Sequence, residues 1–308
     1  MVVERITDLM TQQATTTNVT ADLDQLTKTD NELSSGLAIT EPSDNPYGAS
    51  VVLDLNSQLS QLGSYSSNIT NATSWMNTSS SALSSIENMV QTVRQLVVEG
   101  ANGTNTAADD QSAAQEVDQL IDAIKQTANT TYDGSYIFSG TATSTAPYES
   151  GSDDSYQGNS GTITAAIGSG STVPINTNIE SILGNGNGSN GSDGLLLGTL
   201  RQIASDLNTG TGASQTTLGT TDLTALDNNL NSLDELQANV GALTDRLSIA
   251  SSQIQSTQSA DNTELVNTQD ANMATLATDY STESAGYQAA LQAGAQIIQE
   301  SLLNFLSQ

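Results

Sequence analysis

The chain has 308 residues, with six basic against 34 acidic residues and a formal net charge of −28. Proteins bind nucleic-acid backbones and anionic membrane surfaces through clusters of Lys and Arg, so this composition argues against both partners. Cysteine and histidine are absent, which excludes disulfides, thiol nucleophiles, His-based triads and Cys/His metal sites. Aromatic residues make up only 4% of the chain, so we expect burial along aliphatic stripes of long helices.

The first 20 residues lack the apolar run of a secretory signal peptide, because Glu4 and Asp8 fall where that run would lie. No stretch of the sequence approaches the ~18 apolar residues of a membrane span. We therefore expect a protein that stays in the cytosol or leaves the cell by a route that reads an uncleaved N-terminus.

The segment before Gly36 predicts an amphipathic helix with a narrow apolar stripe. Aliphatic residues recur there at coiled-coil spacing, as Val19, Leu23, Leu26 and Leu33. Gly36 suits a left-handed C-terminal cap, and each proline that follows pushes its preceding residue toward an extended conformation. We interpret the connection as an ordered elbow, formed by Gly36, Pro42, Ser43, Asp44 and Pro46.

A longer helical rod follows the elbow. Its apolar residues lie seven apart without a break, as is typical of a coiled coil or helical bundle: Leu55, Leu62, Ile69, Met76, Leu83, Val90 and Val97. We interpret them as intramolecular core, and Trp75 as packing at the edge of the rod. Asp109 and Asp110 suit the first turn of another helix.

The middle of the chain changes character. The segment TYDGSYIFSGTATSTAPYES alternates apolar with small polar residues between glycines, which predicts strands and turns. Residues 150–194 are rich in Gly, Ser, Thr and Asn, and TITAAI and STVPINTNI within them read as short strands. The Asn-Gly pairs of GNGNGSNGSDG favour hairpin turns. We expect a small β insertion here.

Helical periodicity then returns. A short stripe of leucines and Ile203 precedes a second long rod, which begins near Thr221 and fits one heptad frame, and a thin stripe closes the chain. We predict a mainly α fold, an elongated bundle or coiled coil of paired N- and C-terminal segments with a β-rich insertion at its tip. The predicted domains are a terminal polymerisation domain (1–42 and 270–308), a helical rod domain (43–140 and 195–269) and an outer insertion (141–194).

The narrow terminal stripes lead to a hypothesis of assembly. One pair of such helices buries little apolar area, and ordering it needs many identical chains packed side by side. The candidate subunit-interface residues are Val19, Leu23, Leu26, Leu33, Leu291, Ile298, Leu302 and Phe305. From the residues alone, an ordinary intramolecular core explains these stripes equally well.

Four segments carry a family resemblance: LSSGLAITEPSDNP, NITNATSWMNTSSSALSSIENMVQTVRQLVVEGANGT, ANTTYDGSYIFSGTATSTAPYE and LQAGAQIIQESLLNFLS. They resemble the bacterial flagellin-like proteins, and within that family the members that form the hook–filament junction. The first segment is shared with filament flagellins, whereas YDGSYIFSG together with SLLNFL is more specific for the junction. The resemblance covers residues 1–149 and 195–308. Leu37 and Ala38 depart from it, because they stand where the family commonly has basic residues.

The resemblance implies a structural adaptor of the bacterial flagellum that joins hook to filament. It implies export through the flagellum's own type III channel, hence an extracellular protein without a cleavable signal. The implied partners are copies of the chain itself in a ring at the hook tip, the other hook–filament junction protein, flagellin, and a cytosolic export chaperone. The terminal helices would line the inner tube, which favours the interface interpretation of their stripes.

Two other functions stay open, the filament subunit itself and a secreted coiled-coil adhesin whose Gly/Asn-rich middle binds a ligand. We expect no enzyme, because nothing in the sequence places two carboxylates in a pocket. We also expect neither cofactor nor metal, since the acidic loops at 152–154 and 190–194 lack the spacing of a calcium loop.

Overall fold

The computed structural model describes residues 8–306 apart from 104, 152, 186 and 189–190, and this part of the chain is mainly helical, as predicted. The chain forms two compact units, a terminal unit (Met1–Gln61 with Thr257–Gln308) and a central unit (Leu62–Ser256). Two long helices, α2 (Pro46–Gly100) and α7 (Leu223–Gln269), contribute to both. No described helix is long and apolar enough to cross a membrane. The division into three domains stays a prediction.

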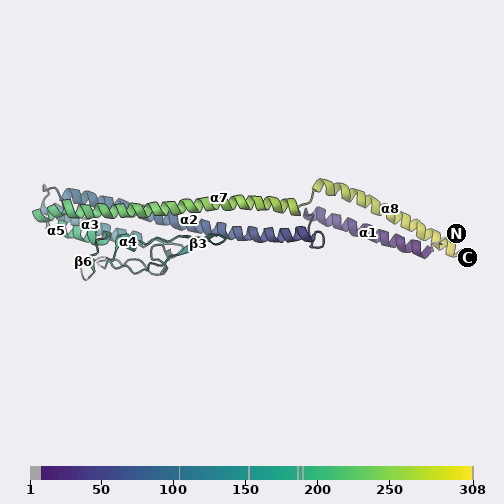
Figure 1. Ribbon diagram of the computed structural model, residues 1–308, viewed down its shortest axis with the longest axis horizontal. Coiled ribbons are helices and arrows are strands. Elements are labelled where there is room, and N and C mark those ends of the chain that lie inside the picture. The colour runs from purple at the N-terminus through teal and green to yellow at the C-terminus, as the bar shows by residue number, and fades with distance from the viewer. Residues whose placement is uncertain (1–7, 104, 152, 186, 189–190, 307–308) are drawn as a thin grey trace. The chain divides into compact units, whose positions relative to one another are not determined.

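The terminal unit is built on the two end helices, α1 (Asp8–Ser35) and α8 (Met273–Leu306), which lie side by side (Figure 1). They run antiparallel. Gln25 Nε2 donates to Glu283 Oε1 at 3.2 Å in the middle of the pair, and the Ala271 amide donates to Gly36 O at 2.9 Å near its end. The antiparallel pairing expected for the two ends of the chain is therefore confirmed.

The apolar core of the described residues lies in the central unit and extends from Ile69 to Ile254. It is lined by α2, α7, α3 (Ala107–Ala128) and α5 (Leu196–Thr209), and α3 packs against α5. The heptad positions predicted for the first rod are fully buried in this core from Met76 onward: Met76, Leu83, Val90 and Val97. Ser79, a polar residue within that stripe, donates its hydroxyl to Trp75 O at 3.1 Å and so stays satisfied.

The second rod helix begins differently from the expectation. A short helix α6 (Gly212–Thr217) and a five-residue π-helix, η1 (Leu218–Asp222), precede α7. Thr211 caps α6 and bonds reciprocally with Ser214, as in a capping box. Apolar periodicity does not reveal the π turn, because a single wide turn changes the spacing by only one residue.

In the described part of the segment after α3, the strands form three two-stranded antiparallel sheets. They pair β1 (Thr131–Tyr132) with β2 (Ser135–Tyr136), β3 (Thr164–Gly168) with β4 (Ser171–Pro174), and β5 (Asn187–Gly188) with β6 (Gly191–Ser192). A one-turn helix, α4 (Glu180–Leu183), lies between the last two sheets. Asp133 and Gly134 both have positive φ, 48° and 74°, as an Asp-Gly hairpin turn requires. The predicted short strands are confirmed.

The position of the β insertion differs from the prediction. Instead of sitting at the tip of the bundle, the β3–β4 hairpin lies along the flank of the central unit's rod helices (Figure 1). Asn68 Nδ2 on α2 donates to Ala166 O at 3.1 Å, and Arg246 on α7 donates to Thr172 O at 3.3 Å. The hairpin's Ile167 and Val173 belong to the rod's own core. Burying them there removes apolar surface from water, which a placement beyond the rod ends would leave exposed.

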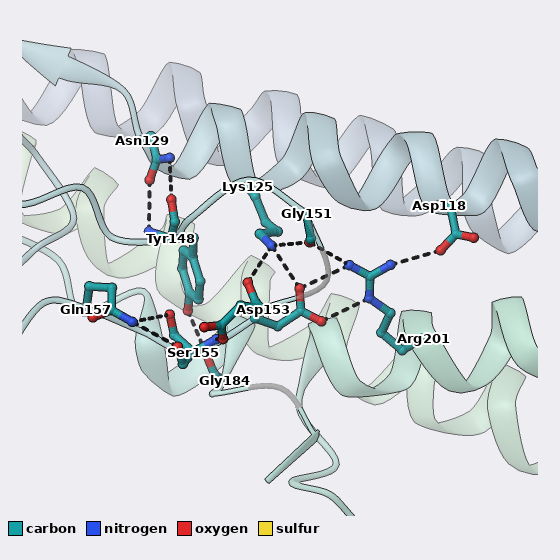
Figure 2. Close-up of polar contacts among 11 residues, drawn as sticks. Asp118, Lys125, Asn129, Tyr148, Gly151, Asp153, Ser155, Gln157, Gly184 and Arg201 are labelled. Atoms are coloured by element: carbon teal, nitrogen blue, oxygen red, sulfur yellow. Dashed lines mark hydrogen bonds and ion pairs between the residues drawn. The ribbon is translucent and has the colours of Figure 1, made fainter.

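A buried polar network fastens the loop after β2 to α3 and α5 (Figure 2). Lys125 is 1% exposed, and its ammonium donates to Gly151 O and Asp153 O, both at 2.7 Å, and to Asp154 Oδ1 at 3.0 Å. Arg201 Nε donates to Asp154 Oδ2 at 2.9 Å. Burial raises the pKa of Asp154, but its hydrogen bonds from Arg201 and Lys125 outweigh burial and hold the pKa below its ordinary value.

Candidate functional site: the terminal helix pair and its elbow

The elbow begins where α1 ends. Gly36 adopts φ +76°, a left-handed conformation that suits glycine, and its amide donates to Glu32 O at 2.8 Å. Leu37 then forms an antiparallel bridge with Asp270, and the Ala38 amide donates to Gln269 O at 2.7 Å. The elbow and the connection between α7 and α8 therefore hold each other through backbone hydrogen bonds.

Asp44 is the polar centre of the elbow. Its Oδ2 accepts from the Thr40 amide at 3.1 Å and the Glu41 amide at 3.0 Å, and its Oδ1 lies 3.2 Å from Lys28 Nζ on α1. The amides of Glu41 and Thr40, and after them Lys28, lower the pKa of Asp44 to about 2. One carboxylate thus closes the turn and ties it back to α1.

The second half of the elbow starts α2. Pro46 is the first helical residue, where its missing amide hydrogen costs nothing, and Asn45 Oδ1 accepts from the Gly48 amide at 2.9 Å as a helix cap. A methyl group at Gly48 would lie 2.5 Å from Ile39 Cδ1. The elbow therefore packs directly on the first turn of α2. Of the predicted elbow residues, Gly36, Asp44 and Pro46 hold its geometry. The Ser43 hydroxyl donates to Glu41 Oε2 at 3.2 Å, and Pro42 is exposed.

The predicted interface residues are incompletely buried in the single chain. Val19, Leu26 and Leu33 are half-buried, whereas Leu23 remains 43% exposed and Leu291 44% exposed. The other predicted interface residues, Ile298, Leu302 and Phe305, belong to α8, and their side chains lie outside the described part of the structure. The terminal pair thus leaves part of its apolar stripe in solvent.

The contrast with the central unit is large. In the terminal unit the most buried described apolar residues, Ile39, Ala49, Val52 and Leu276, each keep 8% of their surface exposed, whereas most of the central core residues are at 0%. Further large apolar side chains of the terminal unit lie on the surface: Met10, Tyr47, Leu53, Val266 and Met273. Two large apolar side chains of the central unit, Val98 and Ile249, are exposed as well. Whether the terminal surface is a subunit interface stays a prediction.

One feature of the site was missed from the sequence. Lys28, which ties Asp44 to α1, carried no signal in the periodicity. The break between α7 and α8 lies at residues 270–272, next to the boundary that the sequence analysis predicts between residues 269 and 270. Asn272 caps α8 there, because its Oδ1 accepts from the Ala274 and Thr275 amides.

The described polar side chains of the acidic loops bond to the chain's own groups. Among the described residues, no three Asp, Glu, His or Cys side chains converge as metal ligands would. Asp154 forms ion pairs with Lys125 and Arg201, and Asp193 accepts a hydrogen bond from the Asn185 amide at 2.8 Å.

Comparison with known proteins shows which family the helical regions of this chain resemble. The model of the bacterial flagellin N-terminal helical region matches residues 6–143, and that of the C-terminal helical region matches residues 223–306. Flagellar hook-associated protein 3 of Salmonella typhimurium is 29% identical over 172 residues, 56% of this chain and 54% of that protein. Flagellin of Clostridium tyrobutyricum is 33% identical over 114 residues, 37% of this chain and 30% of that protein. The chain thus spans about half or less of the length of these relatives.

Solved structures share the fold. Flagellar hook-associated protein 3 from Legionella pneumophila superposes with a TM-score of 0.59 at 15% identity, over 70% of this chain and 98% of that one. FlgL of Bacillus cereus superposes with a TM-score of 0.56 at 20% identity, over 70% and 99%. At these identities the likeness is one of fold alone. Because the two family models match the helical regions at both ends, the chain belongs to the bacterial flagellin family.

Proposed function

We propose that the protein is a structural adaptor of the bacterial flagellum that joins the hook to the filament as a ring of identical copies. The observation that carries this proposal is the uneven burial of the chain. The central unit completes its core alone, whereas Leu23, Leu291 and Met10 of the terminal unit stay 43–60% exposed. Packing terminal units side by side removes this surface from water.

The choice of junction over filament rests on the segment after the first rod. Hook-associated protein 3 of Salmonella typhimurium is among the relatives, and flagellins are too. The motif YDGSYIFSG resembles the family members that form the hook–filament junction. It packs into the central core, because Ile137 and Phe138 are fully buried there. Filament flagellins usually lack this motif, so its structural role favours the adaptor.

The partners follow from that role. We infer contacts with neighbouring copies in the ring, with the other hook–filament junction protein below and with flagellin above. We also infer export through the flagellar type III channel, aided by a chaperone that covers the C-terminal helices, and a final location in the extracellular flagellum. The role is structural, and no catalytic step belongs to it.

Two experiments test the proposal. Labelled antibody imaging of purified flagella is expected to give signal only at the distal end of the hook, and signal along the filament would instead identify a filament subunit. Cells without this chain are expected to keep hooks, lack attached filaments and release flagellin into the medium.

A further inference from the structure

A pair of carboxyl groups lies in the central unit where η1 meets α5. Asp222, the last residue of the π turn, is 4% exposed, and its Oδ2 is buried without a hydrogen-bond partner among the described residues. The π turn η1 packs against α5, and Asp206 of α5 interacts with Asp222. Buried polar groups are almost always satisfied, so an unpartnered carboxyl oxygen in an apolar setting requires an explanation.

Apolar side chains lie near this pair in the described part of the chain. Leu207, Leu218 and Leu226, which flank the two carboxyl groups in sequence, are fully buried. Asp206 Oδ2 accepts from Gln202 Nε2 at 2.9 Å. The pair therefore faces burial and mutual repulsion together, and both disfavour two ionised groups.

The charged groups on the neighbouring helices are acidic or already paired. Arg201 of α5 is held by Asp154 and Asp118, both at 2.9 Å. Arg94 of α2 is held by Asp227 of α7 at 2.7 Å. The remaining groups near this end are carboxylates: Asp110 of α3, which accepts from Asn105 Nδ2 at 3.4 Å, and the exposed Glu99 of α2.

We propose that Asp206 and Asp222 share one proton and form a pH-dependent latch that holds the π turn against α5. With the proton in place, one carboxyl group donates an O–H to the other and the two elements are joined. When the proton leaves to the solvent, the hydrogen bond is lost and two carboxylates repel each other. The latch is independent of the proposed flagellar role.

The direction of the effect follows from linkage. Burial first, and then Asp206, raise the pKa of Asp222 to about 6 from an ordinary 3.8. A raised carboxyl pKa stabilises the folded turn fully below about pH 4, and this stabilisation is lost as the pH rises through about 6. Between pH 5 and 7.5 the same linkage predicts that opening of the turn increases about tenfold.

Amide hydrogen exchange of the full chain, read by mass spectrometry over residues 205–223 in EDTA, tests the latch. After correction for intrinsic rates, wild type is expected to exchange about tenfold faster at pH 7.5 than at pH 5. Asp222→Asn is expected to lose this difference and Asp206→Asn to reduce it, because burial of Asp222 remains in the second variant. Asp234→Asn, which removes an exposed charge from α7, is the matched control and should keep it.

The outcomes decide between explanations. Should Asp222→Asn expose the turn at both pH values, Asp206→Asn decides, since its amide can donate to Asp222 without a shared proton. An unchanged pH difference in Asp206→Asn would overturn the latch. So would a flat wild-type profile in EDTA.

Discussion

Two leucine-to-alanine substitutions separate the roles of the two units. Leu83 on α2 is fully buried in the central core, so Leu83→Ala is expected to lower the free energy of unfolding by about 2–5 kcal/mol. Leu23 on α1 is 43% exposed, so covering the rest of it in an assembly contributes roughly 0.6–1.3 kcal/mol per copy. Leu23→Ala is therefore expected to weaken assembly and to leave the central unit unchanged.

The assay uses the chain's single tryptophan as its reporter. Trp75 is 8% exposed and contacts Tyr132 edge-on with ring centroids 6.0 Å apart, so its fluorescence reports unfolding of the central unit in urea. Assembly is followed by analytical ultracentrifugation at increasing protein concentration. Ile249→Ala, at a 71% exposed position in the central unit, is the control and should change neither measurement.

A specific result would refute this reasoning. If Leu23→Ala shifts the Trp75 transition as far as Leu83→Ala does, the terminal stripe is part of the monomer's own core. If it leaves both the transition and the concentration dependence of assembly unchanged, the stripe is not a subunit interface.

The other predictions concern the network, the glycines and the elbow. Asp154→Ala leaves the buried Lys125 without its carboxylate and is expected to cost about 3–5 kcal/mol in urea unfolding, whereas Asp234→Asn should cost almost nothing. Gly36→Ala strains a residue at φ +76° and should lower the stability of the helix pair by about 1–2 kcal/mol. Gly63→Ala within α2 should instead stabilise the protein by about 0.5–1 kcal/mol. Circular dichroism during heating measures both changes, and changes of the same sign would contradict the left-handed conformation of Gly36. Because the pKa of Asp44 is lowered to about 2, its contribution to the elbow is complete above the ordinary 3.8 and lost as the pH falls toward 2. After correction for intrinsic rates, hydrogen exchange over residues 36–49 should therefore accelerate in acid in wild type and be fast at every pH in Asp44→Asn.

The sequence predicts the long helices well because their cores depend on spacing alone. A seven-residue repeat of aliphatic side chains can be buried only on one face of a helix, and Met76, Leu83 and Val90 lie there in the structure. The elbow was predictable for a similar reason. A glycine cap at Gly36 and a proline at the first position of α2 limit the backbone to few conformations.

Contacts between segments that are distant in the sequence produce no such repeat in the sequence. The flank position of the β3–β4 hairpin depends on where Ile167 and Val173 find uncovered rod surface, which no local periodicity records. The ion pair between Lys125 and Asp154 connects α3 to a loop of small polar residues. The sequence around each of these two residues is typical of a solvated surface, so it does not predict the pair. The Asp206–Asp222 pair escaped for the same reason, since it forms only where α5 and η1 meet.

The elbow explains how a weakly packed terminal unit can still present a defined surface. Its order comes from polar contacts that need little apolar burial: the Asp44 carboxylate binds two backbone amides and Lys28, and the Ala38 and Ala271 amides bond across to the facing strand of chain. Such contacts fix the backbone direction over a few residues. The long α1–α8 pair depends instead on the burial of apolar surface, which a single chain buries only in part. In the proposed assembly, a neighbouring copy would complete the apolar stripe of this pair, and the elbow between α1 and α2 would not have to form anew.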